Sequence, residues 1–327
     1  MTTYKGINGF AVQSVATDPS PLDEGQVWYN NATYAFKLAG INAAAWSSGG
    51  NLGTARYQFT AAGTQSAAVA TGGEIQPGST VSDSTEEYDG TSWAGSGNLP
   101  TGTRGQGMSG TQTASLIFGG VISTGLTNAT ASYNGSTWTA IPATMNTSRQ
   151  NIAGIGTQTA ALGFGGVTTV GVNSTESYNG TSWTAVNNMN TSANGRGGSG
   201  IQTAGLAFGA DLTPGLSGAT ESWNGTSWTA VNPLNTARSY VGSAGTQTLA
   251  LCFGGQTPTP TGATELWNGT SWTNNPTGLA TARRLLASAG TQTSALATGG
   301  GPSGGGTTNA TEEWNGAAVA TKTITTS

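Results

Sequence analysis

The sequence contains no His and one Cys, and only 7% of its residues are charged. The lack of His removes the usual general base, most zinc sites and every Ser-His arrangement. One Cys cannot form an internal disulfide, and Cys252 stands in an apolar run where Cys acts as a small hydrophobic residue. We therefore expect no enzymatic activity, no metal and no cofactor, with Cys252 in the core.

Positive charge is scarce as well. Ten Lys and Arg stand against fourteen Asp and Glu, so the formal net charge is −4. This balance offers no electrostatic footprint for a nucleic-acid backbone or an anionic membrane surface. No stretch of eighteen apolar residues occurs, and the N-terminal MTTYKGINGF lacks the pattern of a secretion signal. We expect neither nucleic-acid binding nor membrane insertion, and synthesis in a cytoplasm.

What the chain has in abundance is Gly, with 53 residues, together with Thr, Ser and Asn. These residues disfavour helix, whereas Thr, Val, Tyr and Trp suit a pleated sheet and Gly with Asn suits its turns. Ten Trp at regular intervals argue against a disordered linker. The composition predicts an all-β fold.

An internal repeat is the strongest signal. Thr-Glu-x-(Tyr/Trp)-Asn-Gly-Thr-Ser-Trp recurs with small variations, and its last residues are spaced by 45, 45, 45 and 44 positions. A second segment, Gly-Thr-Gln-Thr followed by a small apolar run and Gly-Gly, occurs six times with small variations. The structural repeat Trp residues are Trp93, Trp138, Trp183, Trp228 and Trp272, and the repeated Gln residues are Gln65, Gln112, Gln158, Gln202, Gln247 and Gln292.

A period of about 45 residues suits four short strands, which make one propeller blade. In the fifth copy we assign these strands to residues 238–245, 248–254, 263–267 and 270–273. Asn-Gly before the last strand predicts a two-residue hairpin loop. With that loop Tyr178 and Trp183 are diagonal neighbours on one face of the sheet. Such an aromatic pair in each blade is expected to supply most of the contact between blades.

The repeats resemble the kelch-like propellers, whose blades carry Gly-Gly after the second strand, an aromatic residue near the end of the third and Trp in the fourth. The resemblance covers about residues 48–316, and Gly-Thr-Gln-Thr replaces the usual kelch turn. It implies a six-bladed β-propeller of four-stranded antiparallel blades. Three segments are similar to sequences in tail-fibre and appendage proteins of marine and cyanobacterial phages. They are the Gly-Thr-Gln-Thr turn, the segment Gly25-Gln26-Val27-Trp28-Tyr29-Asn30 and the ending Thr-Ile-Thr-Thr-Ser.

If residues 34–46 are counted, the sequence contains seven candidate segments for the later strands of a blade, which is one more than six blades require. Trp46 and its neighbours could complete the last blade, residues 321–327 could do so instead, or a seventh blade could exist. We place an N-terminal arm at residues 1–47, with or without the closing strand near Trp46, and the propeller at residues 48–327. Residues 1–24 contain Asp18-Pro19-Ser20-Pro21, so they form either an attachment segment or a poorly ordered terminus.

The loops at one end of the expected blades vary in length. From the repeated Gln to the first Gly of Gly-Gly the separation is constant, whereas from that Gly to the next strand it ranges between 10 residues (Gly165 to Thr175) and 13 residues (Gly72 to Thr85). Loops on a rigid scaffold are frequent binding sites. The candidate ligand-binding residues are Ser79, Thr80, Asp83, Ser123, Thr124, Asn128, Thr168, Asn173, Asp211, Thr213, Thr257, Thr259, Ser303 and Asn309.

Repeated charges are expected to be structural. Glu recurs at one repeat position and Arg at another, and a functional site would seldom be copied into nearly every blade. Asp83 and Asp211 belong to blades one and four of a six-membered ring, too far apart for a glycosidase pair. The repeated residues are Glu86, Glu176, Glu221, Glu265 and Glu312, with Arg56, Arg104, Arg149, Arg238 and Arg283; Ala131 and Ala193 are exceptions.

The resemblance to phage appendages implies a non-enzymatic virion protein, on a phage tail or capsid surface, synthesised in the host cytoplasm. Its expected partners are other virion proteins and a host-surface receptor or polysaccharide, and homo-oligomers are compatible with it. Two functions stay open at this point. One is an adhesin that binds the host, with a glycan as the expected ligand, through the variable loops; the other is a structural component that binds other virion proteins.

Overall fold

The computed structural model describes residues 12–212 and 215–324. The regular structure of these residues is β-strand, and none of them is in an α-helix, which confirms the predicted all-β class. Accordingly, this part of the chain holds no helix that could cross a membrane. The chain divides into a large unit, Trp46–Asn315, and a small unit made of the residues before Trp46 and after Asn315.

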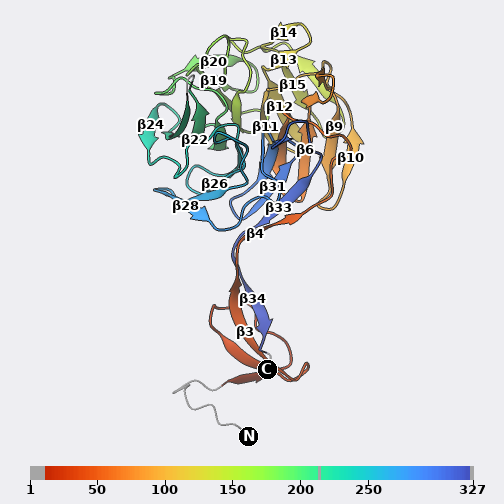
Figure 1. The fold of residues 1–327 in the computed structure, drawn as a ribbon, viewed down its shortest axis with the longest axis vertical. Coiled ribbons are helices and arrows are strands. Elements are labelled where there is room, and N and C mark those ends of the chain that lie inside the picture. Colours follow the sequence, from red (N-terminus) through yellow and green to blue (C-terminus); the bar gives the residue numbers. More distant parts are fainter. Residues whose placement is uncertain (1–11, 213–214, 325–327) are drawn as a thin grey trace. The chain divides into compact units, whose positions relative to one another are not determined.

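The large unit is propeller-like. Within its described residues it contains six four-stranded antiparallel sheets, here sheets 1 to 6 in chain order. Figure 1 shows them following one another around a common centre, from orange to blue. The first strand of each sheet contacts the first strands of two other sheets, in the order β5, β11, β17, β21, β25, β30 and again β5.

The strands of sheets 1 to 3 follow one pattern, with the first strand innermost. Sheet 1 contains β5 (Thr60–Thr64), β6 (Ala67–Thr71), β9 (Thr85–Tyr88) and β10 (Trp93–Ser96). Sheet 2 contains β11 (Gly107–Thr111), β12 (Ala114–Phe118), β15 (Thr130–Tyr133) and β16 (Trp138–Ile141). Sheet 3 contains β17 (Ala153–Gly156), β18 (Ala161–Phe164), β19 (Thr175–Tyr178) and β20 (Trp183–Val186).

Sheets 4 and 5 repeat that order, and sheet 6 takes its fourth strand from the beginning of the chain. Sheet 4 contains β21 (Gly197–Ile201), β22 (Ala204–Asp211), β23 (Leu216–Trp223) and β24 (Trp228–Val231). Sheet 5 contains β25 (Gly242–Gly245), β26 (Ala250–Phe253), β27 (Thr264–Trp267) and β28 (Trp272–Asn275). Sheet 6 contains β30 (Ala287–Gly290), β31 (Ser294–Thr298), β33 (Thr311–Asn315) and β4 (Ala45–Ser48).

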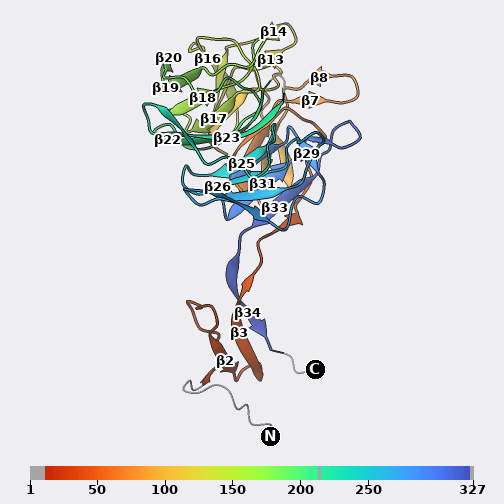
Figure 2. The same cartoon turned by 60° about the vertical axis from the view of Figure 1, so that its left-hand side comes forward.

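Short hairpins extend some of the loops between second and third strands. One of them, β7–β8, stands out from the sheets in Figure 2. These hairpins are β7 (Glu74–Ile75) with β8 (Thr80–Val81) and β13 (Val121–Ile122) with β14 (Gly125–Leu126). A third two-stranded pair joins β29 (Arg283–Arg284), in the connection before sheet 6, to β32 (Gly301–Pro302), in a loop of that sheet.

The second strand of each sheet is buried on both faces, because it lies between neighbouring sheets. In β18 all four residues, Ala161-Leu162-Gly163-Phe164, are buried. A strand that is covered on both sides reads as a continuous apolar run rather than as an alternating one. This explains the small apolar segment that precedes each Gly-Gly.

The predicted hairpin register was wrong. Tyr178 pairs directly with Trp183, so the loop between β19 and β20 has four residues rather than two. The Asn179 side chain causes the difference: its Oδ1 accepts hydrogen bonds from the N–H groups of Thr181 and Ser182, both at 2.9 Å. An Asn that caps the backbone ahead of it forms a wider turn. The aromatic pair is nevertheless present, with the two rings 5.2 Å apart.

Each fourth-strand Trp also bonds to the neighbouring sheet. Its indole N–H donates to the hydroxyl of a third-strand Thr in the preceding sheet, at 3.0–3.1 Å. Trp46 of β4 takes part in the same way. The pairs are Trp46 with Thr264, Trp93 with Thr311, Trp138 with Thr85, Trp183 with Thr130, Trp228 with Thr175, and Trp272 with Thr220.

The repeated Gln forms a second set of bonds between sheets. Gln158 donates from Nε2 to the carbonyls of Tyr133 at 2.6 Å and Ser115 at 3.0 Å, both in sheet 2. The other five Gln residues make the equivalent pair of bonds to the sheet before them, and Gln65 of sheet 1 bonds to Trp314 of sheet 6. One amide thus satisfies two backbone carbonyls of another sheet.

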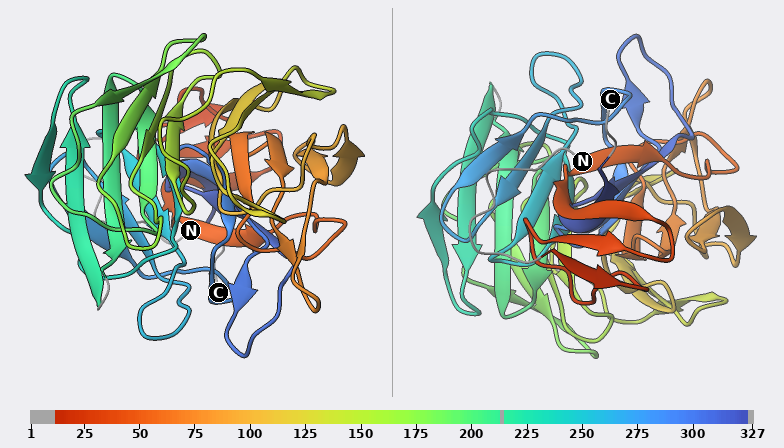
Figure 3. Two further views of the ribbon diagram at one scale, coloured as in Figure 1. Left: turned by 90° about the horizontal axis from the view of Figure 1, so that it is seen from above. Right: turned by 90° about the horizontal axis from the view of Figure 1, so that it is seen from below.

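The small unit is a four-stranded sheet in the order β1-β2-β3-β34, with β1 parallel to β2 and the other pairs antiparallel. Figure 3 shows its first three strands in red, side by side. Trp28 is fully buried, and its Nε1 donates to Asp18 at 3.0 Å. The strands are β1 (Gln13–Val15), β2 (Val27–Asn30), β3 (Ala35–Asn42) and β34 (Ala318–Thr323).

Candidate functional site

The large unit has two ends that differ in their connections. In an antiparallel sheet the strand direction alternates, so the turns joining strands one to two and three to four lie at one end, here the turn end. The loops joining strands two to three, and the connections from one sheet to the next, lie at the opposite end, here the loop end. In sheet 6 the chain leaves after Asn315 and re-enters at β4 where the other sheets have a turn. Both links to the small unit therefore leave from the turn end.

The predicted ligand-binding residues lie in the loops of the loop end. Most of them are exposed or partly exposed, and Thr213 lies outside the described residues. The exposed ones are Ser79, Thr80, Asp83, Ser123, Thr124, Thr259 and Ser303. The partly exposed ones are Asn128, Thr168, Asn173, Asp211, Thr257 and Asn309.

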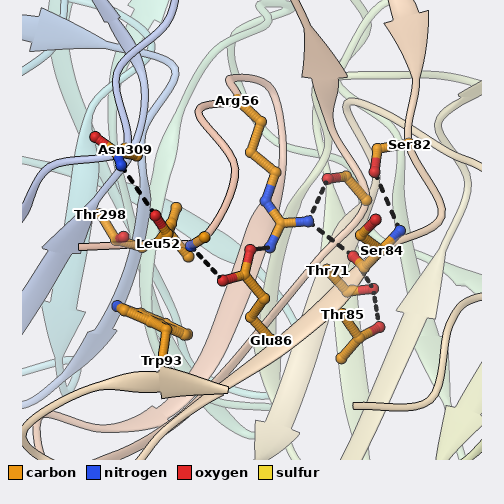
Figure 4. A network of polar contacts seen from close by, with 12 residues as sticks. Leu52, Arg56, Thr71, Ser82, Ser84, Thr85, Glu86, Trp93, Thr298 and Asn309 are labelled. Atoms are coloured by element: carbon orange, nitrogen blue, oxygen red, sulfur yellow. Dashed lines mark hydrogen bonds and ion pairs between the residues drawn. The ribbon is translucent and has the colours of Figure 1, made fainter. Parts of the chain in front are cut away.

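Three of these candidates hold the loops in place. Asn128 donates from Nδ2 to the Met145 carbonyl at 2.8 Å, and Asn173 makes the same bond to Met189 at 3.0 Å. Asn309 donates to the Leu52 carbonyl at 3.0 Å, as Figure 4 shows. Each bond ties a loop to the segment that follows a fourth strand, so these amides serve the fold.

Five backbone hydrogen bonds join residues around the centre of the loop end. Gly105 N–H donates to the Gln58 carbonyl at 2.7 Å, and Asn151 N–H donates to the Gly105 carbonyl at 2.6 Å. On the other side Tyr240 N–H donates to Gly195 at 2.6 Å, Leu285 to Tyr240 at 3.0 Å and Gln58 to Leu285 at 3.0 Å. The axial ring comprises one residue from each sheet connection: Gln58, Gly105, Asn151, Gly195, Tyr240 and Leu285.

Every residue of the axial ring has a positive φ, between 53° and 65°. This conformation is natural for Gly but costs other residues of the order of 1–3 kcal/mol. Gln58, Asn151, Tyr240 and Leu285 nevertheless carry side chains there. A Cβ at Gly195 would lie 2.8 Å from the Tyr240 ring. Gly195 is therefore required, because a side chain at this position would collide with the Tyr240 ring.

The axial ring forms one end of a cavity of about 190 Å³, lined by residues of all six sheets. We call it the axial cavity. Its walls come from the innermost strands, where small residues such as Gly154, Gly198 and Ser243 keep the space open. The ring side chains of Gln58 and Tyr240 also line the cavity and are partly exposed.

A chain of polar contacts borders one side of the axial cavity. Arg104 donates from NH1 to Gln58 Oε1 at 2.6 Å, and its Nε lies 3.1 Å from Glu74 Oε2. Glu74 also accepts a hydrogen bond from the Tyr57 hydroxyl at 2.8 Å. Gln58 Nε2 lies 3.5 Å from Asn151 Oδ1. Glu74 follows the second strand of sheet 1 and Arg104 precedes the first strand of sheet 2, and their opposite charges neutralise each other.

The opposite side contains Tyr240. Its hydroxyl lies 2.7 Å from Asn194 Oδ1 and 3.0 Å from Asp211 Oδ2, within donor distance of both. Burial, and then the hydrogen bond to the Asp211 carboxylate, raise the pKa of Tyr240. The phenol therefore stays neutral and orients Asp211. Beside it Arg284 donates to Gln256 Oε1.

The repeated Arg and Glu residues form buried ion pairs within their sheets. Arg56 NH2 lies 2.9 Å from Glu86 Oε1, as Figure 4 shows, and equivalent pairs occur in sheets 3, 5 and 6. Sheet 4 uses Arg196, three positions further on, at 3.5 Å from Glu221. The placement of Arg104 in this series was wrong. It stands one position later than the others, because Thr103 occupies the repeat position.

Sequence reasoning missed Gln58, Arg104 and Tyr240 as residues around one cavity. They lie in the connections between sheets, outside the variable loops that we had singled out. The only sequence signal was that the residues of these connections differ from copy to copy, while the sequence around them repeats. Among the described residues, no three His, Cys, Asp or Glu side chains are grouped closely enough to hold a metal ion. Comparison with protein-family models and with curated protein sequences finds no match.

Proposed function

We propose that the large unit is a closed six-bladed propeller of kelch-like type. The contacts of the innermost strands support this, because they pass from β30 back to β5. So do the six Trp–Thr bonds, which link sheet 5 to sheet 6 through Trp46 and sheet 6 to sheet 1 through Trp93. The two Gln65 bonds to sheet 6 join the same seam.

The protein is, in our proposal, a non-enzymatic phage adhesin, located on the virion, that binds host-surface glycan through the loop end. One observation carries this reading: both links to the small unit leave from the turn end, while loops of variable length and the axial cavity lie at the other end. The links to the small unit therefore do not interrupt the connections of the loop end. The phage assignment rests on the resemblance of the repeat and of residues 25–30 to phage appendage proteins.

Binding to cells tests the adhesin function. The purified full chain, labelled with a fluorophore, is mixed with cells of marine cyanobacterial strains and with their isolated envelope polysaccharide. We expect saturable binding to at least one strain at micromolar concentration, and competition by its polysaccharide. Replacing the exposed hairpin tip 77–80 by Gly-Ser is expected to weaken binding if this loop contacts the host. No binding to any strain or polysaccharide would contradict the proposal.

A second function, as a structural virion component, is favoured by the small unit. Six of the ten exposed large hydrophobic side chains in the described residues belong to it, including Tyr34 at 82% and Phe36 at 50% exposure. Exposed apolar surface is a feature of protein contacts, and its enrichment in the small unit favours a protein partner there. Locating the chain in intact particles separates the two functions, because an adhesin belongs at a distal tip and a decoration protein on the capsid or neck.

A further inference from the structure

We propose that the axial cavity binds one neutral sugar ring, a pyranose, at the loop end. This inference rests on the proposed adhesin function and gives it a defined subsite. It differs from the loop residues that the sequence suggested, because its contacts come from the axial ring and the innermost strands.

The size of the cavity fits one six-membered ring. Its volume is about 190 Å³, and an apolar cavity of roughly 150 Å³ is enough to hold a benzene-sized ligand. A disaccharide would have to extend beyond the cavity. We therefore assign one sugar ring to the axial cavity, with any further residues of a glycan lying over the loops.

Hydroxyl and amide groups line the cavity. Ser243 Oγ accepts the Gly198 N–H at 3.3 Å, and Ser288 Oγ accepts the Ser243 N–H at 3.0 Å. Each Ser hydroxyl used as an acceptor retains its own hydrogen for donation. Gln58 uses its side-chain carbonyl for Arg104 and one N–H for Asn151 Oδ1, which leaves its second N–H and the two N–H groups of the Asn151 amide as donors. These groups suit the hydroxyls of a sugar, which both donate and accept.

The charges around the cavity favour a neutral ligand. Arg104 lies against Glu74, Arg284 against Gln256, and Asp211 accepts from Tyr240. Arg196, the one charged residue in the lining itself, is paired with Glu221 at 3.5 Å, and its side chain is 1% exposed. The three arginines at the cavity are thus matched by three carboxylates, and an acidic sugar would bring an unmatched negative charge, so it should bind more weakly than a neutral one.

Strain in the axial ring supports a ligand role for its side chains. Sheets 2 and 4 carry Gly at this position, where Gly relieves the positive φ, so the scaffold accepts Gly there. Tyr240 keeps a large ring in the same conformation and presents it to the cavity. Aromatic faces are frequent partners for the C–H side of small ligands in pockets.

The substitution Tyr240→Gly tests the site with a matched control. Gly105 and Gly195 already place Gly at the equivalent positions of the axial ring, so the variant should retain the fold. The control is Tyr34→Gly, which makes the same chemical change at the same backbone conformation, φ 53°, in the small unit. Unchanged circular dichroism and thermal unfolding identify folded variants. Asp211→Asn is a second site variant, for use if Tyr240→Gly does not fold.

Binding is measured by titration calorimetry and ligand-detected NMR with glucose, galactose, mannose, N-acetylglucosamine and, as acidic probes, glucuronate and N-acetylneuraminate. We expect a Kd of the order of 1 mM for at least one neutral sugar, at least tenfold weaker binding to Tyr240→Gly, and binding to Tyr34→Gly within about twofold of the original. Tighter binding of the acidic sugars, equal binding to Tyr240→Gly, or no neutral sugar bound at 100-fold that concentration would each overturn the inference.

The cell-binding assay is run in parallel with the same variants. Cells bound with equal strength by the original chain and by Tyr240→Gly, with no free sugar bound, would refute the axial site and leave the adhesin function standing. A free sugar bound in the axial cavity without any cell bound would refute the adhesin function and leave the site standing. Loss of both in Tyr240→Gly alone would support both.

Discussion

The Arg149–Glu176 ion pair offers a quantitative test of how the sheets are stabilised. The Arg149 side chain is fully buried and that of Glu176 is 2% exposed. Glu176 Oε2 also accepts from the Asn146 backbone N–H at 2.6 Å and from its Nδ2 at 2.8 Å, while Arg149 Nε donates to the Gly165 carbonyl at 3.0 Å. Glu176→Ala therefore leaves a buried guanidinium without its counter-charge.

Removing one partner of such a pair costs about 3–5 kcal/mol, whereas replacing both leaves no unpaired charge and costs much less where the new residues fill the space. The chain contains its own example of the second case: sheet 2 has Thr103 and Ala131 at the two positions. We expect Arg149→Thr and Glu176→Ala each to lower the free energy of unfolding by about 4 kcal/mol. With about 2 cal/mol/K per residue over the large unit, that corresponds to a fall in Tm of about 7 °C.

The assay is a double-mutant cycle by urea and thermal unfolding, monitored by Trp fluorescence. The double variant Arg149→Thr with Glu176→Ala should be more stable than either single variant, giving a coupling energy above about 2 kcal/mol. The same cycle at the partly exposed pair of Arg104 and Glu74 serves as the comparison, with a smaller expected coupling. Additive effects at Arg149 and Glu176 would refute the reasoning.

Three further outcomes are expected. Trp183→Ala should lower the free energy of unfolding by about 3–5 kcal/mol, because it removes ring contacts and the bond to Thr130; a loss below about 1 kcal/mol in urea unfolding would contradict this. Gln158→Ala should cost about 1–2 kcal/mol in the same assay, since two carbonyls lose a donor; full stability would show that these bonds add nothing. Burial and the bond to Glu313 raise the pKa of Tyr88 to about 12. The folded state thus favours the neutral phenol, and its stabilising effect is complete below the unfolded pKa near 10 and lost as the pH rises through 12. Tyrosinate absorbance should show Tyr88→Phe lacking one late-titrating group, and an unchanged titration curve would argue against this bond.

Repetition made most of the fold predictable. Trp183 and its equivalents, with Gly-Gly and Asn-Gly at fixed distances, specify four-stranded units because each copy must bury the same side chains against the next. The hairpin register was not predictable from the same letters. Asn-Gly fits a two-residue loop, but Asn179 Oδ1 captures two backbone N–H groups and lengthens the turn. A side chain that competes with the backbone alters pairing without altering periodicity.

The candidate site was less accessible to prediction for a physical reason. Contacts such as Tyr240 to Asp211 and Arg104 to Gln58 join different copies of the repeat. They depend on which residues meet at the centre, and strand patterns carry no information about that. The same holds for the Gln158 amide, whose partners are carbonyls of another sheet. Repetition identifies the units, whereas the contacts between units require coordinates.

The position of β4 has a consequence for how the chain folds during synthesis. Its residues are made before the other strands of the large unit, yet its partner β33 ends at Asn315. At about 5–20 residues per second, translation of the intervening segment takes roughly 15–50 s. During that time β4 has no partner strand, and Trp46 can meet Phe253 and Thr264 of sheet 5 before it meets Trp314 of sheet 6. Completion of the last sheet is thus a late, long-range event in the folding of the large unit.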